Sequence, residues 1–315
     1  MYSCSEDELK KIKPTLFLTW LIYAVLNRVL ASDGTRDDIY LGGIETSKNV
    51  PRVQVPAVSS SFVDLSTSDD PTVPAVSSSS VASDLTALDL TVDDVWGMDP
   101  SSPAIVANAF NIAISVAMLH LLKGTEWLSD EIVNFYFGMI VARCPNKNVY
   151  AFSTHFFAKL FFDSKPRAYN YDKVATWSNK FDPFTLDKIF VPINLPGHWT
   201  FIIVYIRKKW IHFYDSLHKN GAQYRDAIMK WLEQEAENRT ITFDRRQWET
   251  KDGDSPSQKA NGTECGVFTL MSADILSNDN PLASDTFGLA DMPKFRRQIA
   301  RDILRGKLDG DDQGT

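Results

Sequence analysis

The stretch IFVPINLPGHWTFIIVYIRKKWIHFYD, residues 189–215, decides the fold of this chain. It holds three short runs rich in Val, Ile, Phe, Tyr and Trp, a composition typical of strands, at 189–194, 198–206 and 210–215. Short connections, Leu-Pro-Gly and Arg-Lys-Lys, separate the runs. Strands joined so closely run in opposite directions, so the stretch predicts a three-stranded antiparallel meander.

Helical periodicity precedes these strands. A helix is predicted over 127–141, with Ser129 as its N-cap ahead of two acidic residues. The uncharged run at 105–122 is expected to be a buried segment that leads into the folded domain.

Helical periodicity returns after the strands, at 222–236, 265–276 and 293–308. In the last of these segments, Phe295, Ile299 and Leu304 are expected to face inward and many of the arginines outward. Helices, then strands, then helices predict an α+β fold with a central, antiparallel-rich sheet and helices packed around it.

The acidity of the chain is confined to one segment. Its 315 residues, 44% hydrophobic and 12% aromatic, suffice for one or two domains and exclude a fully disordered, collagen-like or small disulfide-stapled protein. Nearly all of the net charge of −7 comes from residues 51–95, where seven acids face the single Arg52. Because phosphate contacts need clustered Lys and Arg, no nucleic-acid partner is expected.

Residues 51–98 are predicted to be a disordered Ser/Asp-rich linker. They contain an imperfect repeat, VPAVSSSFVDL and VPAVSSSSVASDL, and too little hydrophobic bulk to offset the entropy of ordering. A plain spacer is the preferred interpretation, and the alternative is that short hydrophobic-acidic pieces add a strand to a partner's sheet. The expected parts are thus an N-terminal segment with a short apolar helix (1–50), the linker, a folded domain (99–308) and a tail (309–315).

The apolar run TLFLTWLIYAVL at 15–26 raises the question of a membrane. About twelve residues are too few to span a bilayer, so stable insertion is not expected. The acidic residues Glu6, Asp7 and Glu8 do not suit the start of a signal peptide. We therefore expect a helix that packs on the domain or on a partner, and a signal peptide or anchor over 15–31 is the alternative.

Cys265 is the candidate nucleophile among the three cysteines, Cys4, Cys144 and Cys265, which are too few for a disulfide framework. It follows the loop Asn-Gly-Thr-Glu and begins a helical run, and a helix N-terminus favours a thiolate. Gly266, the next residue, permits another group to approach closely. The alternative is that Cys265 is a small buried hydrophobic residue.

His198 and Asp215 are the candidates for the base and for the group that orients it. If residues 207–209 form the turn, the two residues lie on neighbouring antiparallel strands, toward the same end of the hairpin. His198 would accept the thiol proton, and Asp215 would fix its tautomer. The other histidines lie at mid-strand, in a turn, or in helical or apolar settings that favour a structural role.

Five blocks of sequence carry a family resemblance: GTEWLSDEIVNFY (124–136), FVPINLPGHWTFIIVY (190–205), IHFYDSL (211–217), NGTECGVF (261–268) and MPKFRRQIARDIL (292–304). In order and spacing, they resemble the ubiquitin-like-protein proteases, the sentrin (SUMO)-specific cysteine peptidases of the adenain-like clan. The resemblance covers about residues 110–308. It implies a papain-like or adenain-like cysteine protease fold, with residues 99–308 as the catalytic domain.

The resemblance also implies roles for individual residues. Cys265 matches the nucleophile, His198 the general base and Asp215 the residue that orients the base. The predicted substrate-binding residues are Trp127, Trp199 and Asp130. The two indoles match a pair that covers a narrow tunnel for the substrate's Gly-Gly end, where only residues without side chains can pass.

One position departs from the family's pattern. The oxyanion-hole glutamine usually stands six residues before the nucleophile, where this chain has Lys259. With a one-residue insertion in the loop, Gln258 and the Cys265 backbone amide would hold the oxyanion. The alternative is that Lys259 faces the site and acts electrostatically. Glu264, directly before the nucleophile, stands where Asp is commoner.

The leading hypothesis is a cysteine isopeptidase or endopeptidase that cleaves after the Gly-Gly of SUMO or a related ubiquitin-like modifier, without a metal or other cofactor. Its partners would be the modifier and its conjugates, and its location the nucleus or the cytoplasm. A second hypothesis, motivated by Lys259, is a modifier-binding module without turnover. A third, the acetyl transfer known in the same clan, is less favoured because two indoles would obstruct an acyl-CoA donor.

Overall fold

The computed structural model describes residues 90–144, 148–163, 168–259 and 261–308, all within one unit of the chain, Ala75–Thr315. The predicted apolar helix at 15–26, the linker up to residue 89 and the tail at 309–315 lie outside the described residues. Among the described helices, none is long and apolar enough to cross a membrane.

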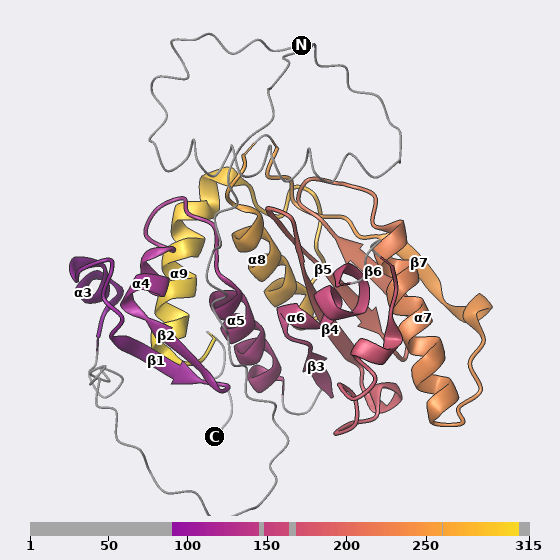
Figure 1. The fold of residues 1–315 in the computed structure, drawn as a ribbon. Coiled ribbons are helices and arrows are strands. Elements are labelled where there is room, and N and C mark those ends of the chain that lie inside the picture. The colour runs from indigo at the N-terminus through magenta and orange to yellow at the C-terminus, as the bar shows by residue number, and fades with distance from the viewer. Residues whose placement is uncertain (1–89, 145–147, 164–167, 260, 309–315) are drawn as a thin grey trace, which may run out of the picture. The chain divides into compact units, whose positions relative to one another are not determined.

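Five strands form the central sheet, in the order β3-β4-β5-β6-β7 (Figure 1). Its middle is the predicted antiparallel meander of β4 (Lys188–Leu195), β5 (His198–Tyr205) and β6 (Trp210–Tyr214). Two strands that the sequence did not predict, β3 (Val149–Ala151) and β7 (Glu249–Asp252), extend the edges parallel to β4 and β6. The prediction of an antiparallel-rich sheet is confirmed, and the complete sheet is mixed.

Helices cover both faces of this sheet. One face packs against α5 (Asp130–Arg143) and α8 (Cys265–Ser277), with α9 (Met292–Arg305) packed on these helices in the same core, and the other face packs against α6 (Thr154–Phe157) and α7 (Ala222–Asn238). Because successive strand residues point to opposite faces, Phe201 and Ile203 of β5 enter the first core, and Ile202 and Val204 enter the second. The helices predicted at 222–236, 265–276 and 293–308 are confirmed within a few residues, as is the α+β class.

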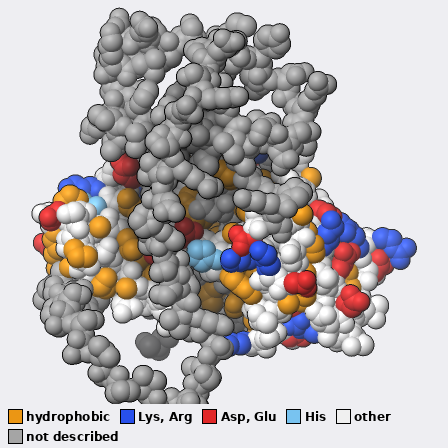
Figure 2. Space-filling model, in the orientation of Figure 1, with side chains coloured by type: hydrophobic (Ala, Val, Ile, Leu, Met, Phe, Trp, Pro, Cys, Tyr) orange, Lys and Arg blue, Asp and Glu red, His pale blue; other side chains and the backbone are white. Residues whose placement is uncertain are grey.

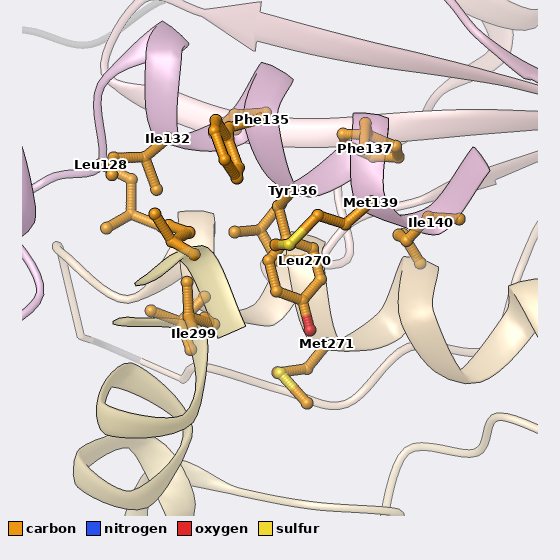
Figure 3. Packing of buried hydrophobic residues seen from close by; sticks show 14 of the residues in the cluster. Leu128, Ile132, Phe135, Tyr136, Phe137, Met139, Ile140, Leu270, Met271 and Ile299 are labelled. Carbon is orange, nitrogen blue, oxygen red and sulfur yellow. The ribbon is translucent and has the colours of Figure 1, made fainter. Parts of the chain in front are cut away.

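Helices α5 and α8 contribute equally to the first core. Figure 3 shows Phe135, Tyr136 and Met139 of α5 gathered with Leu270 of α8 and Ile299 of α9. The Ser129 side chain accepts a hydrogen bond from the backbone N–H of Ile132, which confirms the predicted N-cap. The helix begins at Asp130, so Trp127 precedes it instead of lying within it.

Residues 105–122 form more structure than the single buried segment expected. They fold into a hairpin of β1 (Ile105–Ala109) and β2 (Ile112–Ser115), followed by the short helix α4 (Val116–His120). Phe110 and Asn111 at the turn have φ values of 56° and 57°, the left-handed conformation of a tight two-residue hairpin turn. A hairpin of this kind is usually signalled by Asn-Gly or Asp-Gly, and neither pair is present here.

Ordered structure begins before residue 99, where the domain was expected to start. Helix α3 (Val92–Gly97) starts with a capping box between Thr91 and Asp94, and it buries Val92 and Val95. The predicted linker over 51–98 is therefore too long at its C-terminal end, because the apolar residues of α3 pack into the first core.

Shorter turns complete the described chain, with a π-helical turn at Ala158–Phe162 and 3₁₀ turns at Tyr171–Lys173, Pro183–Thr185, Arg245–Gln247 and Leu289–Asp291. Figure 2 shows acidic and basic side chains interspersed on the α7 side of the face in view. One such pair is Lys230 with Asp226, whose Nζ and Oδ2 atoms lie 3.0 Å apart. This mixture agrees with the balanced charge of the sequence after residue 95.

Candidate active site

His198 and Asp215 meet at one end of the hairpin formed by β5 and β6. His198 is the first residue of β5, and Asp215 directly follows β6. His198 Nε2 lies 2.6 Å from Asp215 Oδ1, and both side chains are buried. Asp215 also accepts the backbone N–H groups of Leu217, at 2.8 Å, and Lys219, at 3.1 Å. Since Nε2 bonds to a carboxylate, it carries a proton, and Nδ1 is left to act as the acceptor of a neutral imidazole.

Cys265 is the first residue of α8 and is only 1% exposed. The loop before it is shaped by Asn261, whose Oδ1 accepts the backbone N–H groups of Thr263, at 2.8 Å, and Glu264, at 3.0 Å. Cys265 lies close enough to His198 to raise the pKa of its imidazole. The structure thus brings the hydrogen-bonded pair of Asp215 and His198 close to Cys265, at the positive end of a helix.

The groups around His198 favour a protonated imidazole. Burial alone lowers the pKa of His198, but the hydrogen bonds and charges of Asp215 and Cys265 outweigh burial and raise that pKa to about 9. For Asp215, burial raises the pKa, but His198 and the two backbone N–H groups hold it below its usual value. An imidazolium beside a thiol stabilises the thiolate, which is the nucleophilic form of cysteine.

Gln258 is 1% exposed, whereas Lys259 is exposed. Gln258 Oε1 accepts a hydrogen bond of 2.6 Å from Ser216 Oγ, and its Nε2 donates one of 2.5 Å to the carbonyl of Asn261. The glutamine side chain therefore lies between the residue after Asp215 and the loop before Cys265. Lys259 adopts a φ of 53°, and this left-handed residue falls where the sequence suggested an insertion in the loop.

The two predicted indoles are tied to the segments around Cys265. Trp127, 44% exposed, donates from Nε1 to the carbonyl of Gly262 at 2.9 Å. Trp199, 5% exposed, donates from Nε1 to the carbonyl of Leu128 at 3.0 Å. Asp130 lies three residues after Trp127, in the first turn of α5, and is half-buried.

Two residues of this region were missed from the sequence. Ser216, described above, orients Gln258. Arg296 of α9 is 2% exposed and pairs with buried Glu264 at 2.8 Å between Nε and Oε2. The other arginines of this helix, Arg297, Arg301 and Arg305, are exposed, so the expectation of many outward arginines holds with Arg296 as the exception. The helical spacing held a signal for Arg296, because it lies on the same face as buried Met292 and Ile299.

The other described cysteine, Cys144, follows the last residue of α5 and is buried and free. No group of three or more His, Cys, Asp or Glu side chains within the described ranges is arranged to hold a metal ion.

Comparisons with known proteins identify the family of this chain. The sequence model of the Ulp1 protease family, C-terminal catalytic domain, matches residues 126–307. Sentrin-specific protease 2 of Mus musculus is 30% identical over 211 residues, which are 65% of this chain and 34% of that protein. A sentrin-specific protease of Caenorhabditis elegans is 30% identical over 228 residues, 70% of this chain and 31% of that protein. The chain thus spans about a third of the length of these curated relatives.

A solved structure shares the fold. The X-ray structure of the C-terminal Ulp1 protease domain in complex with Smt3, the yeast ortholog of SUMO, is 30% identical and has a TM-score of 0.58. The similarity covers 68% of this chain and 92% of that domain. The adenain-like cysteine protease fold implied by the sequence is therefore confirmed. Because the family's catalytic-domain model matches more than half of the sequence, this chain belongs to the Ulp1 protease family.

Proposed function

We propose that this chain is a cysteine isopeptidase or endopeptidase that cleaves after the Gly-Gly C-terminus of SUMO or a related ubiquitin-like modifier. The observation that carries the proposal is the buried pair of His198 and Asp215, 2.6 Å apart, with Cys265 close to His198 at the N-terminus of α8. The relatives support the choice of substrate, since the curated ones are sentrin-specific proteases and the solved Ulp1 domain is bound to Smt3.

The proposed reaction has two steps through one base. His198 Nδ1 takes the thiol proton, and Cys265 Sγ forms a bond to the carbonyl carbon of the final glycine, whose oxygen becomes an oxyanion. When this intermediate collapses, the C–N bond breaks, and His198 gives its proton to the departing amine. Water then attacks the thioester and loses a proton to His198. The C–S bond breaks, and the modifier leaves with a free carboxylate.

Two donors are proposed for the oxyanion. The first is the backbone N–H of Cys265, in the first turn of α8, where amide groups have no intrahelical acceptor. The second is Gln258 Nε2, which carries two protons and gives one of them to the carbonyl of Asn261. The other proton is then available for the oxyanion. In a buried site such donors act at low dielectric, where they are strongest.

Substrate selection is assigned to the two indoles. Trp127 is held by a hydrogen bond to the carbonyl of Gly262, in the loop before Cys265, and Trp199 by one to the carbonyl of Leu128, the residue after Trp127. In the proposal they enclose the Gly-Gly tail, while Asp130 contacts the modifier. Cleavage of modifier precursors and conjugates would place the protein in the nucleus or the cytoplasm, which a fluorescent fusion can check.

The test is hydrolysis of a fluorogenic amide at the C-terminus of SUMO. Turnover is expected in the wild type and should disappear in Cys265→Ala and in His198→Ala, with circular dichroism spectra unchanged. Wild-type turnover in Cys265→Ala would overturn the proposal. A SUMO vinyl sulfone probe provides a second readout, because tight binding without labelling of Cys265 would favour a modifier-binding module. The alternative of a module without turnover is based on Lys259 at the glutamine's usual position. It has less support because Gln258 is buried and accepts a hydrogen bond from Ser216.

A further inference from the structure

Arg296 places a buried guanidinium beside Glu264, the residue that precedes Cys265. Its Nε donates to Glu264 Oε2 at 2.8 Å, its Nη1 to the carbonyl of Leu121 at 2.9 Å, and its Nη2 to the carbonyl of Glu126 at 2.9 Å. Each of the three nitrogens of the guanidinium therefore has an acceptor. The acceptors come from two segments of chain that are far apart in sequence from each other and from α9.

One of these segments leads directly into Cys265, and the other leads to Trp127. Glu264 directly precedes Cys265, and its backbone carbonyl accepts the N–H of Phe268 in the first turn of α8. The carbonyls of Leu121 and Glu126 belong to the stretch that leads to Trp127. The same two segments meet again where Trp127 Nε1 donates to the carbonyl of Gly262. Arg296 thus joins, in the buried interior, the two segments of chain that Trp127 joins at the surface.

We infer that Arg296 is a positioning residue, which fixes the N-terminal turn of α8 and the segment 121–128 relative to each other, so that Cys265 lies in reach of His198. The inference rests on the proposed function. The guanidinium suits this task because it is planar, permanently charged and presents its donors in a rigid fork. A lysine at the same place would offer a single charged nitrogen and could not reach all three acceptors along separate directions.

The stability of the fold does not by itself explain the buried ion pair of Arg296 and Glu264. Removal of one partner of a buried ion pair leaves an uncompensated charge, but replacement of both partners by apolar residues of similar size is often neutral or favourable. A chain that needed only stability could therefore fill this space with apolar side chains. The bonds to the carbonyls of Leu121 and Glu126 add a geometric constraint that apolar side chains cannot supply.

The experiment compares four proteins with the fluorogenic SUMO amide. They are the wild type, the double variant Glu264→Met with Arg296→Met, the single variant Arg296→Lys, and the control Arg297→Met. Arg297 is the matched control because it neighbours Arg296 on α9 but is exposed and pairs with Asp93 at the surface. Melting temperatures and circular dichroism report whether each variant is folded.

If Arg296 positions the nucleophile, kcat falls about 10- to 100-fold in the double variant and in Arg296→Lys, because small displacements of reacting groups cost rates of this order. A rise in KM is also expected, because the segment 121–128 carries Trp127, so the fall in kcat is the result that tests the position of Cys265. Arg297→Met should keep the wild-type kcat. A wild-type kcat in the folded double variant or in Arg296→Lys would overturn the inference, as would a raised KM at constant kcat.

A second readout separates this inference from the proposed function. In a Cys4→Ser background, the rate of alkylation of Cys265 by iodoacetamide depends on the contact with His198 and needs no modifier. The rate should fall at least about tenfold in both Arg296 variants. If the wild type is alkylated rapidly but does not cleave SUMO, the proposed function fails while the inference is still decided by alkylation. If alkylation is equal in all four proteins, the inference fails.

Discussion

Ser216 Oγ donates a hydrogen bond of 2.6 Å to Gln258 Oε1, and the backbone carbonyl of Ser216 accepts the backbone N–H of Gln258 at 3.1 Å. An amide side chain presents its oxygen on one side and its NH₂ group on the other. The hydroxyl therefore fixes which side of the carboxamide faces Ser216 and directs Nε2 toward the loop before Cys265. Since Ser216 follows Asp215, one turn of chain supports both the orientation of His198 and that of the proposed oxyanion donor.

Loss of the Ser216 hydroxyl should reduce turnover through Gln258. We expect Gln258→Ala to lower kcat about 10²–10³-fold, the usual cost of a lost oxyanion donor. Ser216→Ala should lower kcat by roughly tenfold, because the carboxamide loses one of its two orienting bonds, and Ser216→Thr should retain activity. In the double variant, Ser216→Ala should add nothing to Gln258→Ala. Steady-state kinetics with the SUMO amide checks this, and additive losses would contradict an action through Gln258.

Asp215→Asn should impair turnover much more than its small change in shape suggests. Asp215 accepts three hydrogen bonds, from His198 and from the backbone N–H groups of Leu217 and Lys219. An asparagine offers one oxygen and one NH₂ group, so it cannot accept all three, and an NH₂ group toward His198 would favour the wrong tautomer. We expect kcat to fall by up to about 10⁴-fold with little change in KM. A loss below tenfold would argue that Asp215 does not set the tautomer.

The stability contributed by His198 should depend on pH with a defined sign. Despite burial, which lowers it, the pKa of His198 is raised by Asp215 and Cys265 from 6.5 to about 9. The folded state therefore binds the proton more tightly than the unfolded state does. Its contribution to the free energy of unfolding is complete below about pH 6.5 and is lost as the pH rises through about 9.

Urea denaturation of the wild type and of His198→Asn at pH 6, 7.5 and 9.5 measures this contribution. The difference in the free energy of unfolding should be largest at pH 6 and smallest at pH 9.5. Cys265→Ser removes one of the two groups that raise the pKa, so in that background the decline should occur over a narrower range of pH. A difference that grows with pH would contradict the assigned charge state.

The middle of the fold could be predicted because its strands are buried on both sides. All eight residues of β5 are buried, and the matching run of Val, Ile and Phe is visible in the sequence. Strand β7 is the opposite case, since all four of its residues are exposed and its pairing with β6 depends on backbone hydrogen bonds. The β1–β2 hairpin was missed because its turn, Phe110 and Asn111, has neither of the usual glycine pairs.

The candidate site could be predicted only in part, for a related reason. His198 and Asp215 lie at the ends of neighbouring strands, so strand order alone places them close together. Ser216 and Arg296 act through partners that lie 42 and 32 residues away, across loops whose path the sequence pattern does not define. Arg296 also contradicts the ordinary preference of arginine for the surface, and only its helical spacing marked it as inward-facing.

Gly266 is required by the close approach of Leu128. A Cβ atom at residue 266 would lie 2.9 Å from Leu128 Cγ and 3.1 Å from Leu128 Cβ, so a side chain there must displace Leu128. The carbonyl of Leu128 holds Trp199 Nε1, and the displacement would reach the proposed substrate tunnel. We expect Gly266→Ala to destabilise the fold by about 1–3 kcal/mol and to lower kcat/KM. Gly288→Ala is the control, since nothing lies within 4 Å of its Cβ position, and equal stabilities in urea denaturation would contradict the prediction.

Trp127 offers a direct test of selection by exclusion. With a SUMO amide whose penultimate glycine is replaced by alanine, the wild type should show a kcat/KM lower by at least about 10²-fold, because the added methyl group cannot pass between the indoles. Trp127→Ala opens one wall, so it should narrow this discrimination while it also weakens cleavage of the Gly-Gly substrate. Trp127 is 44% exposed, and its removal should therefore cost little stability, whereas Trp199→Ala should destabilise the fold by about 3–5 kcal/mol because Trp199 is only 5% exposed. If the ratio of kcat/KM for the two substrates is the same in Trp127→Ala and in the wild type, Trp127 does not select the glycines. An indole that encloses the tail would change this ratio when it is removed.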